Sequence, residues 1–260
     1  MWCTDLTSNN ALAGLRLLTT RPEKQAARLL QPLQQAGIET TQIPLIEIRP
    51  CELDAAARQK LMDLDLYHQV IVVSPSAADL LITQLEDYWP QWPVGIQWWC
   101  VGAGSVARLQ QAGIEAGCPA TGDKSEDLLQ RPEFAHYDQQ RVLLVKGAGG
   151  RDLLASTLTA RGARVEPLVL YERVWPTLSP AQLQTLRQGE HQAVVLTSGE
   201  ALAHYTHRLQ GQRQDLPLFL PSQRLVDQAR KSGFTQVINC QGAGAEAILS
   251  ALLQYFSSAQ

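Results

Sequence analysis

The sequence predicts an α/β protein with two lobes, each built on a mostly parallel β-sheet. Two observations predict this class. Short apolar, β-branched runs alternate with longer helical segments along the chain, which is the pattern of repeated βα units. The same order of segments occurs twice, with landmarks at a nearly constant spacing. The length of 260 residues suits one large domain or two small ones.

The first half contains the expected segments of several βα units. Two of its helices end just before a glycine, Gly37 or Gly113, which is a common residue after a helix C-terminus. The expected strands or extended segments are Leu15–Thr19, Thr41–Ile48, Gln69–Val73 and Gln97–Val101, and the expected helices are Glu23–Ala36, Ser76–Leu85 and Ser105–Ala112.

The second half repeats this alternation. Gly162 and Gly233 again follow expected helices. The expected strands are Val142–Val145, Ala193–Leu196, Leu218–Leu220 and Gln236–Asn239, and the expected helices are Asp152–Ala160, a helix from Glu200, Gln223–Lys231 and Glu246–Tyr255.

Four landmarks align the two halves. Pro44-Leu45 corresponds to Pro167-Leu168 and His68-Gln69 to His191-Gln192, both at an offset of 123 residues. Gly113 corresponds to Gly233 and Glu126 to Glu246, both at an offset of 120. The shared order indicates an internal duplication. Two generic α/β halves with similar turns are the alternative.

Composition and charge exclude several classes of protein. The chain has 22 Lys and Arg against 25 Asp and Glu, a net charge of −3, which argues against a broad basic face for nucleic acid. The five cysteines are scattered and form no C-x-x-C pair, so neither a disulfide framework nor a zinc site is expected. This use of cysteine is typical of a protein from a reducing compartment. The N-terminus has no signal-peptide pattern and no apolar run is of membrane-spanning length, so we expect a cytoplasmic protein, with residues 1–13 as a frayed lead-in.

The loops after the strands are the expected place for chemistry. In α/β proteins ligands bind at the carboxyl ends of parallel strands, and between two lobes the default site is the cleft. Arg21 follows the first strand near a helix start and would suit an anion, unless it is an ordinary surface arginine. The loop from Lys146 through Gly147 to Arg151 combines three glycines with two cations, unless it is only a flexible connection.

Three further loops offer donors at helix starts. Ser74-Pro75-Ser76 and Thr197-Ser198-Gly199 hold equivalent places in the two halves and suit a joint carboxylate clamp, unless they are simple helix caps. The stretch Gly102–Ala107 reads G-x-G-x-x-A, a weak dinucleotide fingerprint, although its helix start could equally hold a carboxylate.

Among aromatic and basic side chains, Tyr171 stands out, because it lies where the chain must cross between the lobes. A phenol there can donate a proton or a hydrogen bond; the alternative is a packing role. The five histidines form no metal-ligand pattern, and the pair His204 and His207 is expected on a solvated helix face.

Nine short motifs follow one another in a fixed order along the chain. They are Thr20-Arg21-Pro22, Pro44 to Ile48, Val72 to Ala77, Val101-Gly102 with Ala107, Ser125 to Leu129, Gly147 to Arg151, Val169 to Arg173, Leu196 to Ser198, and Pro221 to Arg224. Each motif is short, but as an ordered set over about residues 14–253 they resemble the uroporphyrinogen-III synthase family.

The resemblance implies a particular fold. It implies two flavodoxin-like α/β domains joined by a two-stranded β connector, with an active-site cleft between them. The first βα unit and the last third of the chain would form one domain, residues 1–43 and 172–260, and residues 44–171 the other. The connector strands would lie near Ile43–Ile48 and Leu168–Arg173.

The resemblance also implies a reaction. Hydroxymethylbilane, a linear tetrapyrrole with eight carboxylates, would lose water, form a spiro intermediate and close to uroporphyrinogen III with ring D inverted, without cofactor or metal. Tyr171 matches the tyrosine suspected of helping the hydroxyl leave. We expect a monomer in transient contact with hydroxymethylbilane synthase and no nucleic-acid or membrane partner. The expected substrate-binding residues are Arg21, Ser74, Ser76, Gly102, Ser105, Lys146, Gly147, Arg151, Thr197, Ser198, Ser222, Gln223 and Arg224.

Two other functions remain open from the residues alone. A cytoplasmic binding protein with two lobes would use the same strand-end loops for a small molecule. A nucleotide-dependent enzyme would use the Gly102–Ala107 loop, and NAD(P) would then raise its melting temperature.

Overall fold

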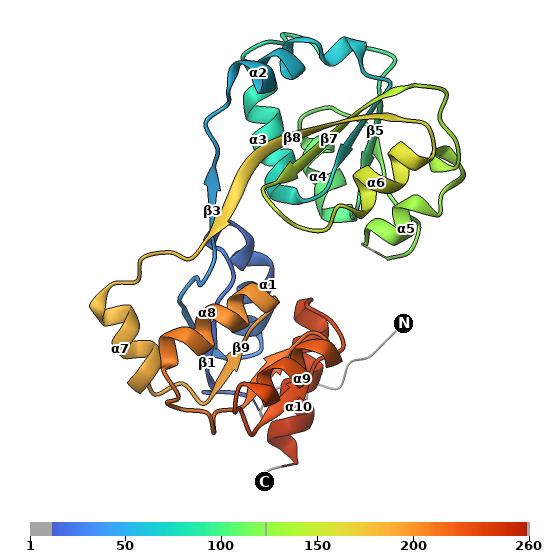
Figure 1. Cartoon of the computed structure of the whole chain (residues 1–260). Coiled ribbons are helices and arrows are strands. Elements are labelled where there is room, and N and C mark those ends of the chain that lie inside the picture. Colours follow the sequence, from blue (N-terminus) through green and yellow to red (C-terminus); the bar gives the residue numbers. More distant parts are fainter. Residues whose placement is uncertain (1–11, 123, 259–260) are drawn as a thin grey trace. The chain divides into compact units, whose positions relative to one another are not determined.

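The computed structural model describes residues 12–122 and 124–258, so the expected lead-in falls almost wholly outside the described part. The chain forms two compact units (Figure 1). The terminal unit combines the residues up to Glu47 with those from Val174 onward, and the central unit is Ile48–Arg173. These boundaries lie within four residues of the expected ones.

The terminal unit contains a five-stranded sheet in the order β11-β10-β9-β1-β2. Neighbouring strands of this sheet pair in parallel, for example Leu17 with Ala193 and Leu18 with Thr41. Numbered in chain order this is 2-1-3-4-5, the flavodoxin-like order. The strands are β1 (Arg16–Thr19), β2 (Glu39–Gln42), β9 (Ala193–Val195), β10 (Leu218–Leu220) and β11 (Val237–Asn239).

Helices cover this sheet, and a hydrophobic core lies on each of its faces. Successive residues explain this, because Leu17 packs into one core and Leu18 into the other, as the alternation of a strand requires. The helices are α1 (Glu23–Gln35), α7 (Pro180–Gln188), α8 (Gly199–Leu209), α9 (Gln223–Lys231) and α10 (Ala245–Ser257).

The central unit contains a six-stranded sheet in the order β3-β8-β7-β4-β5-β6. The strands β4 to β8 pair in parallel, and in chain order they read 3-2-1-4-5, a doubly wound arrangement. β4 is buried along its whole length, as expected for a central strand. The strands are β3 (Glu47–Pro50), β4 (Gln69–Val72), β5 (Gln97–Cys100), β6 (Ala116–Gly117), β7 (Arg141–Gly147) and β8 (Arg164–Val174).

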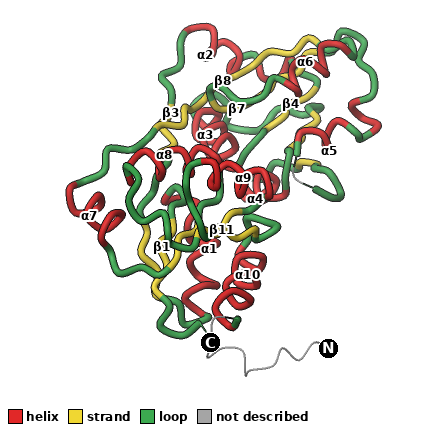
Figure 2. The backbone as a smooth tube through the Cα atoms, turned by 60° about the horizontal axis from the view of Figure 1, so that its bottom comes forward, coloured by secondary structure: helices red, strands yellow, loops and turns green. Residues whose placement is uncertain are grey.

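The helices of the central unit alternate with its strands along the chain (Figure 2). Cores again lie on both faces of the sheet: Val70 belongs to one and Ile71 to the other. The helices are α2 (Ala55–Met62), α3 (Pro75–Glu86), α4 (Ala103–Gln111), α5 (Ser125–Leu129) and α6 (Leu153–Ala160), with the short 3-10 turns η2 (Leu64–Leu66) and η3 (Pro132–Phe134).

This architecture confirms the predicted α/β class with two parallel-sheet units. One expected segment is wrong in detail. Thr41–Ile48 is not one extended run, because β2 ends at Gln42 and β3 starts at Glu47. Proline has no N–H for a ladder, and Leu45 is buried in the core of the terminal unit instead. The two strands consequently belong to different sheets. The structure also contains three helices that were not expected from the sequence, α2, α5 and α7, and each lies in a connection between two strands.

His204 corrects the expected solvated histidine pair. It is fully buried on α8, and its Nδ1–H donates to the carbonyl of Leu45 at 2.7 Å while Nε2 accepts from Nε of Arg208 at 2.7 Å. The ring also stacks on Trp175, with centroids 4.6 Å apart. His204 therefore anchors to the core of the terminal unit both chain segments that lead to the central unit, one ending at Glu47 and one starting at Val174.

His191 is a second buried histidine, and it makes folding sensitive to acid. It is 4% exposed, and neither ring nitrogen has a hydrogen-bond partner among the described residues. Burial, and then the charge of Arg213, lower the pKa of His191 to about 4. Below the unfolded-state pKa of about 6.5 the unfolded chain binds a proton that the folded chain does not.

We expect the free energy of unfolding to fall as the pH drops from about 6.5 towards about 4, with His191 contributing roughly 3 kcal/mol of the loss. His191→Leu should remove this share, and it should not destabilise the protein at neutral pH, because it removes two unpaired buried nitrogens. Urea unfolding of both proteins at several pH values measures it. If the free energy of unfolding depended on pH equally in the wild type and in His191→Leu, His191 would not be a source of the acid sensitivity.

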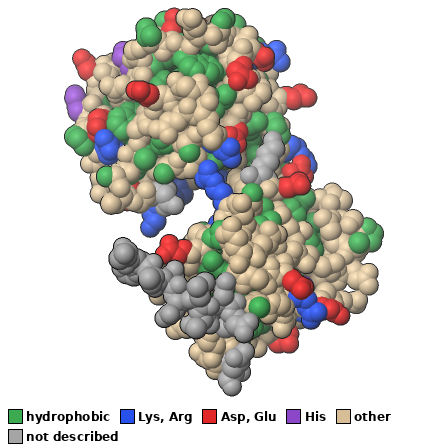
Figure 3. All heavy atoms as spheres, turned by 180° about the vertical axis from the view of Figure 1, so that it is seen from behind, with side chains coloured by type: hydrophobic (Ala, Val, Ile, Leu, Met, Phe, Trp, Pro, Cys, Tyr) green, Lys and Arg blue, Asp and Glu red, His purple; other side chains and the backbone are tan. Residues whose placement is uncertain are grey.

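Acidic and basic side chains are both present on each unit, on the face that Figure 3 shows. This mixture agrees with the small net charge of −3. In the described ranges, no helix combines the length and apolar character that crossing a membrane requires.

Candidate functional site

Both sheets have a switch point where the strand order reverses, and four of the predicted loops, those at Arg21, Ser74, Gly147 and Ser198, follow the strands that flank these points. In the central unit the switch lies between β4 and β7, so the loops at Ser74 and at Gly147 meet its carboxyl edge. In the terminal unit it lies between β1 and β9, next to Arg21 and Ser198. Crevices at such points are the usual ligand sites of open α/β sheets.

Tyr171 is held on three sides in the central unit. Its hydroxyl lies 3.0 Å from Oγ of Ser74, and its carbonyl accepts the N–H of Ala148 at 2.6 Å. Its ring packs on Gly147: a Cβ on that glycine would lie 2.5 Å from Cε2 and 2.6 Å from Cζ of the tyrosine. The absence of a side chain at Gly147 therefore creates the space for the phenol.

A β-bulge aims Tyr171 at this position. β7 and β8 pair regularly up to Lys146 with Val169, but Gly147 then pairs with Tyr171, so Leu170 is an extra residue. Side chains alternate along a strand, and Val169 is 36% exposed. Without the bulge Tyr171 would share the side of Val169; with it, Leu170 and Tyr171 both enter the same core.

Ser74 links the phenol to a helix start. It is the N-cap of α3, and its Oγ accepts the N–H of Ala77 at 3.1 Å. A serine hydroxyl has one proton and two lone pairs, so Oγ can donate to the oxygen of Tyr171 while accepting from Ala77. In that arrangement the phenol proton of Tyr171, which is only 3% exposed, is free to be donated to another group.

The glycine-rich loop that follows β7 is open. Lys146 is half-buried, whereas Gly149 and Gly150 have positive φ and no atom within 4 Å of the place of a Cβ. The guanidinium of Arg151 already has a partner: its Nη1 and Nη2 donate to the two carboxylate oxygens of Glu126 at 2.5 and 3.3 Å. Since both side chains are largely exposed, a substrate carboxylate can compete for this guanidinium.

The Gly102 loop follows β5, one strand away from the switch point. A dinucleotide fingerprint belongs after the central first strand, which here is β4, and the loop after β4 contains no glycine. This placement argues against the nucleotide alternative. Ser105 is 2% exposed, and its N–H donates to the carbonyl of Gly102 at 3.0 Å. Its contact with a substrate stays a prediction.

Four helix starts at the carboxyl edges share one backbone conformation. The N-cap residues of α3, α4, α8 and α9 all have φ between −147° and −158° and ψ between 154° and 161°. Each leaves first-turn N–H groups and the positive end of a helix dipole facing its strand-end loop, which favours anions. These residues are Ser74, Gly102, Ser198 and Ser222.

In the terminal unit the structure brings two predicted loops together. Oγ of Ser198 caps α8 by accepting from Ala201 at 3.1 Å, whereas Ser222 makes no capping bond with its side chain. Nη2 of Arg224 lies 4.0 Å from the place of a Cβ on Gly199, so this cation stands beside the loop Thr197-Ser198-Gly199. Gln223 instead bonds Asp227 on its own helix at 2.9 Å.

Arg21 lies at the end of β1 and is half-buried. One of its N–H groups donates to the carbonyl of Ala243, in the loop before α10, and burial lowers the pKa of its guanidinium. A guanidinium has five N–H donors, so this bond leaves others for an anion. The neighbouring Thr20 is buried, and its hydroxyl donates to Val195 at 3.2 Å, which ties this loop to β9.

The structure thus groups Ser74, Gly147 and Tyr171 in one unit and Ser198 and Arg224 in the other. Ser76 is half-buried in the first turn of α3 and interacts with another group. Sequence reasoning missed Ala148, whose N–H binds the carbonyl of Tyr171. The sequence signal for the β-bulge is the adjacent pair Leu170-Tyr171, because two successive large apolar residues depart from the alternation of buried and exposed side chains along a strand.

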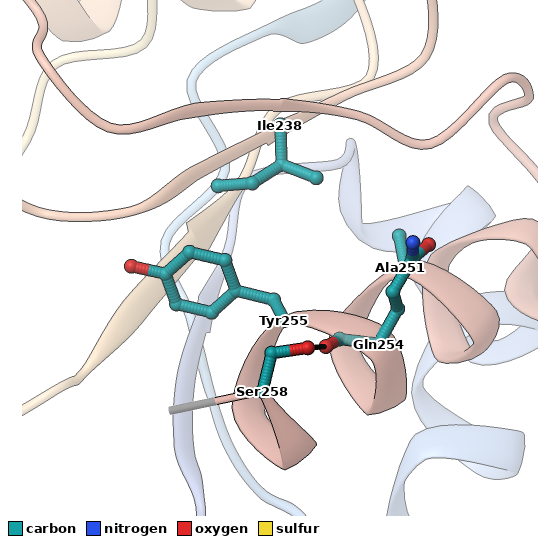
Figure 4. Close-up of a pocket in the computed structure, with 5 residues that line it drawn as sticks. All are labelled: Ile238, Ala251, Gln254, Tyr255 and Ser258. Carbon is teal, nitrogen blue, oxygen red and sulfur yellow. Dashed lines mark hydrogen bonds between the residues drawn. The ribbon is translucent and has the colours of Figure 1, made fainter. Parts of the chain in front are cut away.

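Other features of the described residues do not compete with these loops. Within residues 12–122 and 124–258, no group of three or more His, Cys, Asp or Glu side chains could hold a metal ion. A cavity of about 470 Å³ in the terminal unit lies between β11 and α10, and its lining has no charged side chain (Figure 4). It is lined by Ile238, Ala251, Gln254, Tyr255 and Ser258.

Comparison with known proteins identifies the family. The sequence model described as Uroporphyrinogen-III synthase HemD matches residues 27–250, which is most of the chain. The chain belongs to the uroporphyrinogen-III synthase family. Its members are enzymes of the cyclising lyase type in tetrapyrrole biosynthesis, so the resemblance seen in the sequence motifs is confirmed.

Individual members of the uroporphyrinogen-III synthase family match over nearly the full length. The Salmonella typhimurium enzyme is 30% identical over 92% of this chain and 100% of its own, and the Escherichia coli enzyme 29% identical over the same shares. The crystal structure of the Helicobacter pylori synthetase matches with a TM-score of 0.63 at 15% identity, covering 93% of this chain and 99% of its own. At that identity the structural match shows the fold alone.

Proposed function

We propose that this chain cyclises hydroxymethylbilane to uroporphyrinogen III, with Tyr171 assisting the departure of the hydroxyl group. The family match over residues 27–250 is the observation that supports this reaction. The position of Tyr171, bonded to Ser74 at the switch point of the central sheet, supports its role.

The proposed reaction begins with cleavage of the carbon–oxygen bond of the hydroxymethyl group. The hydroxyl leaves as water after taking a proton, and the remaining azafulvene cation is attacked by the substituted carbon of ring D. The spiro intermediate then fragments and closes again with ring D inverted. Tyr171 donates a hydrogen bond or proton to the leaving oxygen, while Ser74 donates to the phenol oxygen and stabilises its negative charge.

The eight carboxylates of the substrate require many donors, although the chain has a net charge of −3. We assign these donors to helix starts rather than to a broad basic face, because aligned N–H groups bind anions without a net charge. The N-termini of α3, α8 and α9 supply them, with added charge from Arg21, Lys146, Arg151 and Arg224.

Holding the flexible bilane in one conformation would supply much of the rate. The uncatalysed bilane closes at the unsubstituted carbon of ring D, so the protein has to bring the substituted carbon nearer to the cation. Restricting two reacting groups to one geometry is a large catalytic effect.

We also propose that the protein acts as a monomer in the cytoplasm and takes up the bilane during transient contact with hydroxymethylbilane synthase. Free bilane closes on its own to the symmetric product, which favours rapid transfer. The scattered cysteines without a C-x-x-C pair favour a reducing compartment.

The deciding experiment supplies hydroxymethylbilane made in situ and separates the oxidised porphyrin isomers. Mainly type III product is expected. Only the type I isomer from folded protein would overturn the proposal, and it would favour a binding protein with the same fold.

Arg151→Ala should raise KM by about tenfold with little change in kcat, because the proposed contact between this guanidinium and a substrate carboxylate is lost. Glu126→Gln is the matched control: it releases Arg151 and should not raise KM. Steady-state kinetics on the two variants measure this. Equal KM values for wild type and Arg151→Ala would place this arginine outside the site.

A further inference from the structure

Two cysteines occupy neighbouring positions at the edge of the central sheet. Cys100 is the last residue of β5, and Cys118 directly follows β6. The two strands are parallel and pair Trp98 with Ala116 and Trp99 with Gly117. Continuing this register by one residue places Cys118 opposite Cys100.

The two thiols also lie on the same face of the sheet. Trp98 and Cys100 belong to one hydrophobic core, and Ala116 and Cys118 pack against that same core. Trp99 alternates to the opposite face, where it packs on Phe134 with ring centroids 5.1 Å apart. Alternation along both strands therefore directs the two sulfurs to a shared space.

The spacing suits a covalent bond between them. Neighbouring strands are about 4.8 Å apart, within the range of roughly 4.4–6.8 Å between Cα atoms that a disulfide allows. β6 is a two-residue edge strand, and Cys118 lies just beyond its end, so a small shift toward Cys100 breaks no ladder hydrogen bond. Cys118 also raises the pKa of Cys100, after the larger effect of burial, which agrees with their proximity.

We propose that Cys100 and Cys118 are a site of reversible thiol oxidation that forms an intramolecular disulfide. Cys118 is half-buried and Cys100 fully buried, so a peroxide reaches Cys118 first. The Cys118 thiolate attacks one peroxide oxygen, the O–O bond breaks, and the product is a sulfenic acid and water. The Cys100 thiolate then attacks the Cys118 sulfur, the S–O bond breaks, and a second water leaves.

The balance is two thiols and one hydrogen peroxide giving one disulfide and two waters. The second step sets the rate, because burial makes the thiolate of Cys100 rare near neutral pH. The resulting ring encloses α4 and the Gly102 loop, so the bond would restrain one of the helix starts at the carboxyl edge.

The test treats the full chain with hydrogen peroxide, blocks the remaining thiols and digests the protein with trypsin. Trypsin cleaves after Lys60, Arg108 and Lys124, which separates the two cysteines. We expect a cross-linked pair of peptides, Leu61–Arg108 with Leu109–Lys124, about 2 Da lighter than the sum of the reduced peptides. Dithiothreitol should release them, and the rate of formation should rise with pH.

Matched variants separate this bond from general oxidation. Cys118→Ser should abolish the cross-link, whereas Cys51→Ser and Cys240→Ser should retain it. The proposal would be overturned by sulfinic acid at Cys118 without a cross-link, by a disulfide to any other cysteine, or by unoxidised Cys100 and Cys118 after prolonged treatment at raised pH. Because the readout is a peptide mass, it is independent of the proposed enzymatic activity.

Discussion

Replacing Tyr171 with phenylalanine is expected to lower kcat by about 100-fold, the lower end of the range for general acid catalysis, and to leave the fold intact. The ring still fills the space beside Gly147, and only the hydroxyl that lies 3.0 Å from Ser74 is lost. The isomer assay gives kcat, and urea unfolding gives the stability. An unchanged kcat would deny Tyr171 a chemical role.

Tyr137→Phe is the matched control for this variant. Tyr137 is also a 3% exposed tyrosine of the central unit, and its hydroxyl donates to Gln69 at 2.9 Å. Both variants remove one phenol hydrogen bond, so each should cost stability on the order of 1 kcal/mol. Only Tyr171→Phe should lower kcat; equal losses in the two variants would indicate a structural effect.

Adding a methyl group at Gly147 is expected to displace Tyr171 and to reduce activity at least as strongly. The new Cβ would lie 2.5 Å from Cε2 and 2.6 Å from Cζ of the ring, which no real contact tolerates. The ring or strand β8 must shift, at a cost of roughly 1–3 kcal/mol for overpacking. Gly147→Ala should therefore lower both kcat and the urea midpoint.

Two comparisons make the Gly147 result specific. Gly244→Ala adds a methyl group where no atom lies within 4 Å, so it should leave kcat unchanged. The double variant Gly147→Ala with Tyr171→Phe should lose little more kcat than the worse single variant, because both changes act on the same hydroxyl. Losses that multiply would contradict this shared cause.

Local sequence signals accounted for the elements that form the site. The strands β1, β4, β5, β9 and β10 coincide with short apolar runs, and serines mark the starts of the helices that follow β4, β9 and β10. Ser74 and Ser198 are N-caps that bond the third residue of their helices, as their residue type predicts. Such signals act over three or four residues, so no distant part of the chain is needed to read them.

The pairing of distant segments was decided by tertiary structure. β1 pairs with β9, about 175 residues later in the chain. Both strands are apolar and contribute side chains to the cores on the two faces of the terminal sheet, so this pairing buries them together. The β-bulge at Leu170, the burial of His204 and the register of Cys100 with Cys118 depend on the same kind of long-range packing.

The nature of the loops was therefore predictable, whereas their arrangement was not. A serine or glycine after a strand specifies a helix start with free N–H donors wherever the strand lies. Which of these starts adjoin the switch point depends on strand order, and the position of the Tyr171 hydroxyl depends on a one-residue shift between β7 and β8. Burial of apolar surface from the whole unit selects these features, and that free energy is a property of no single segment.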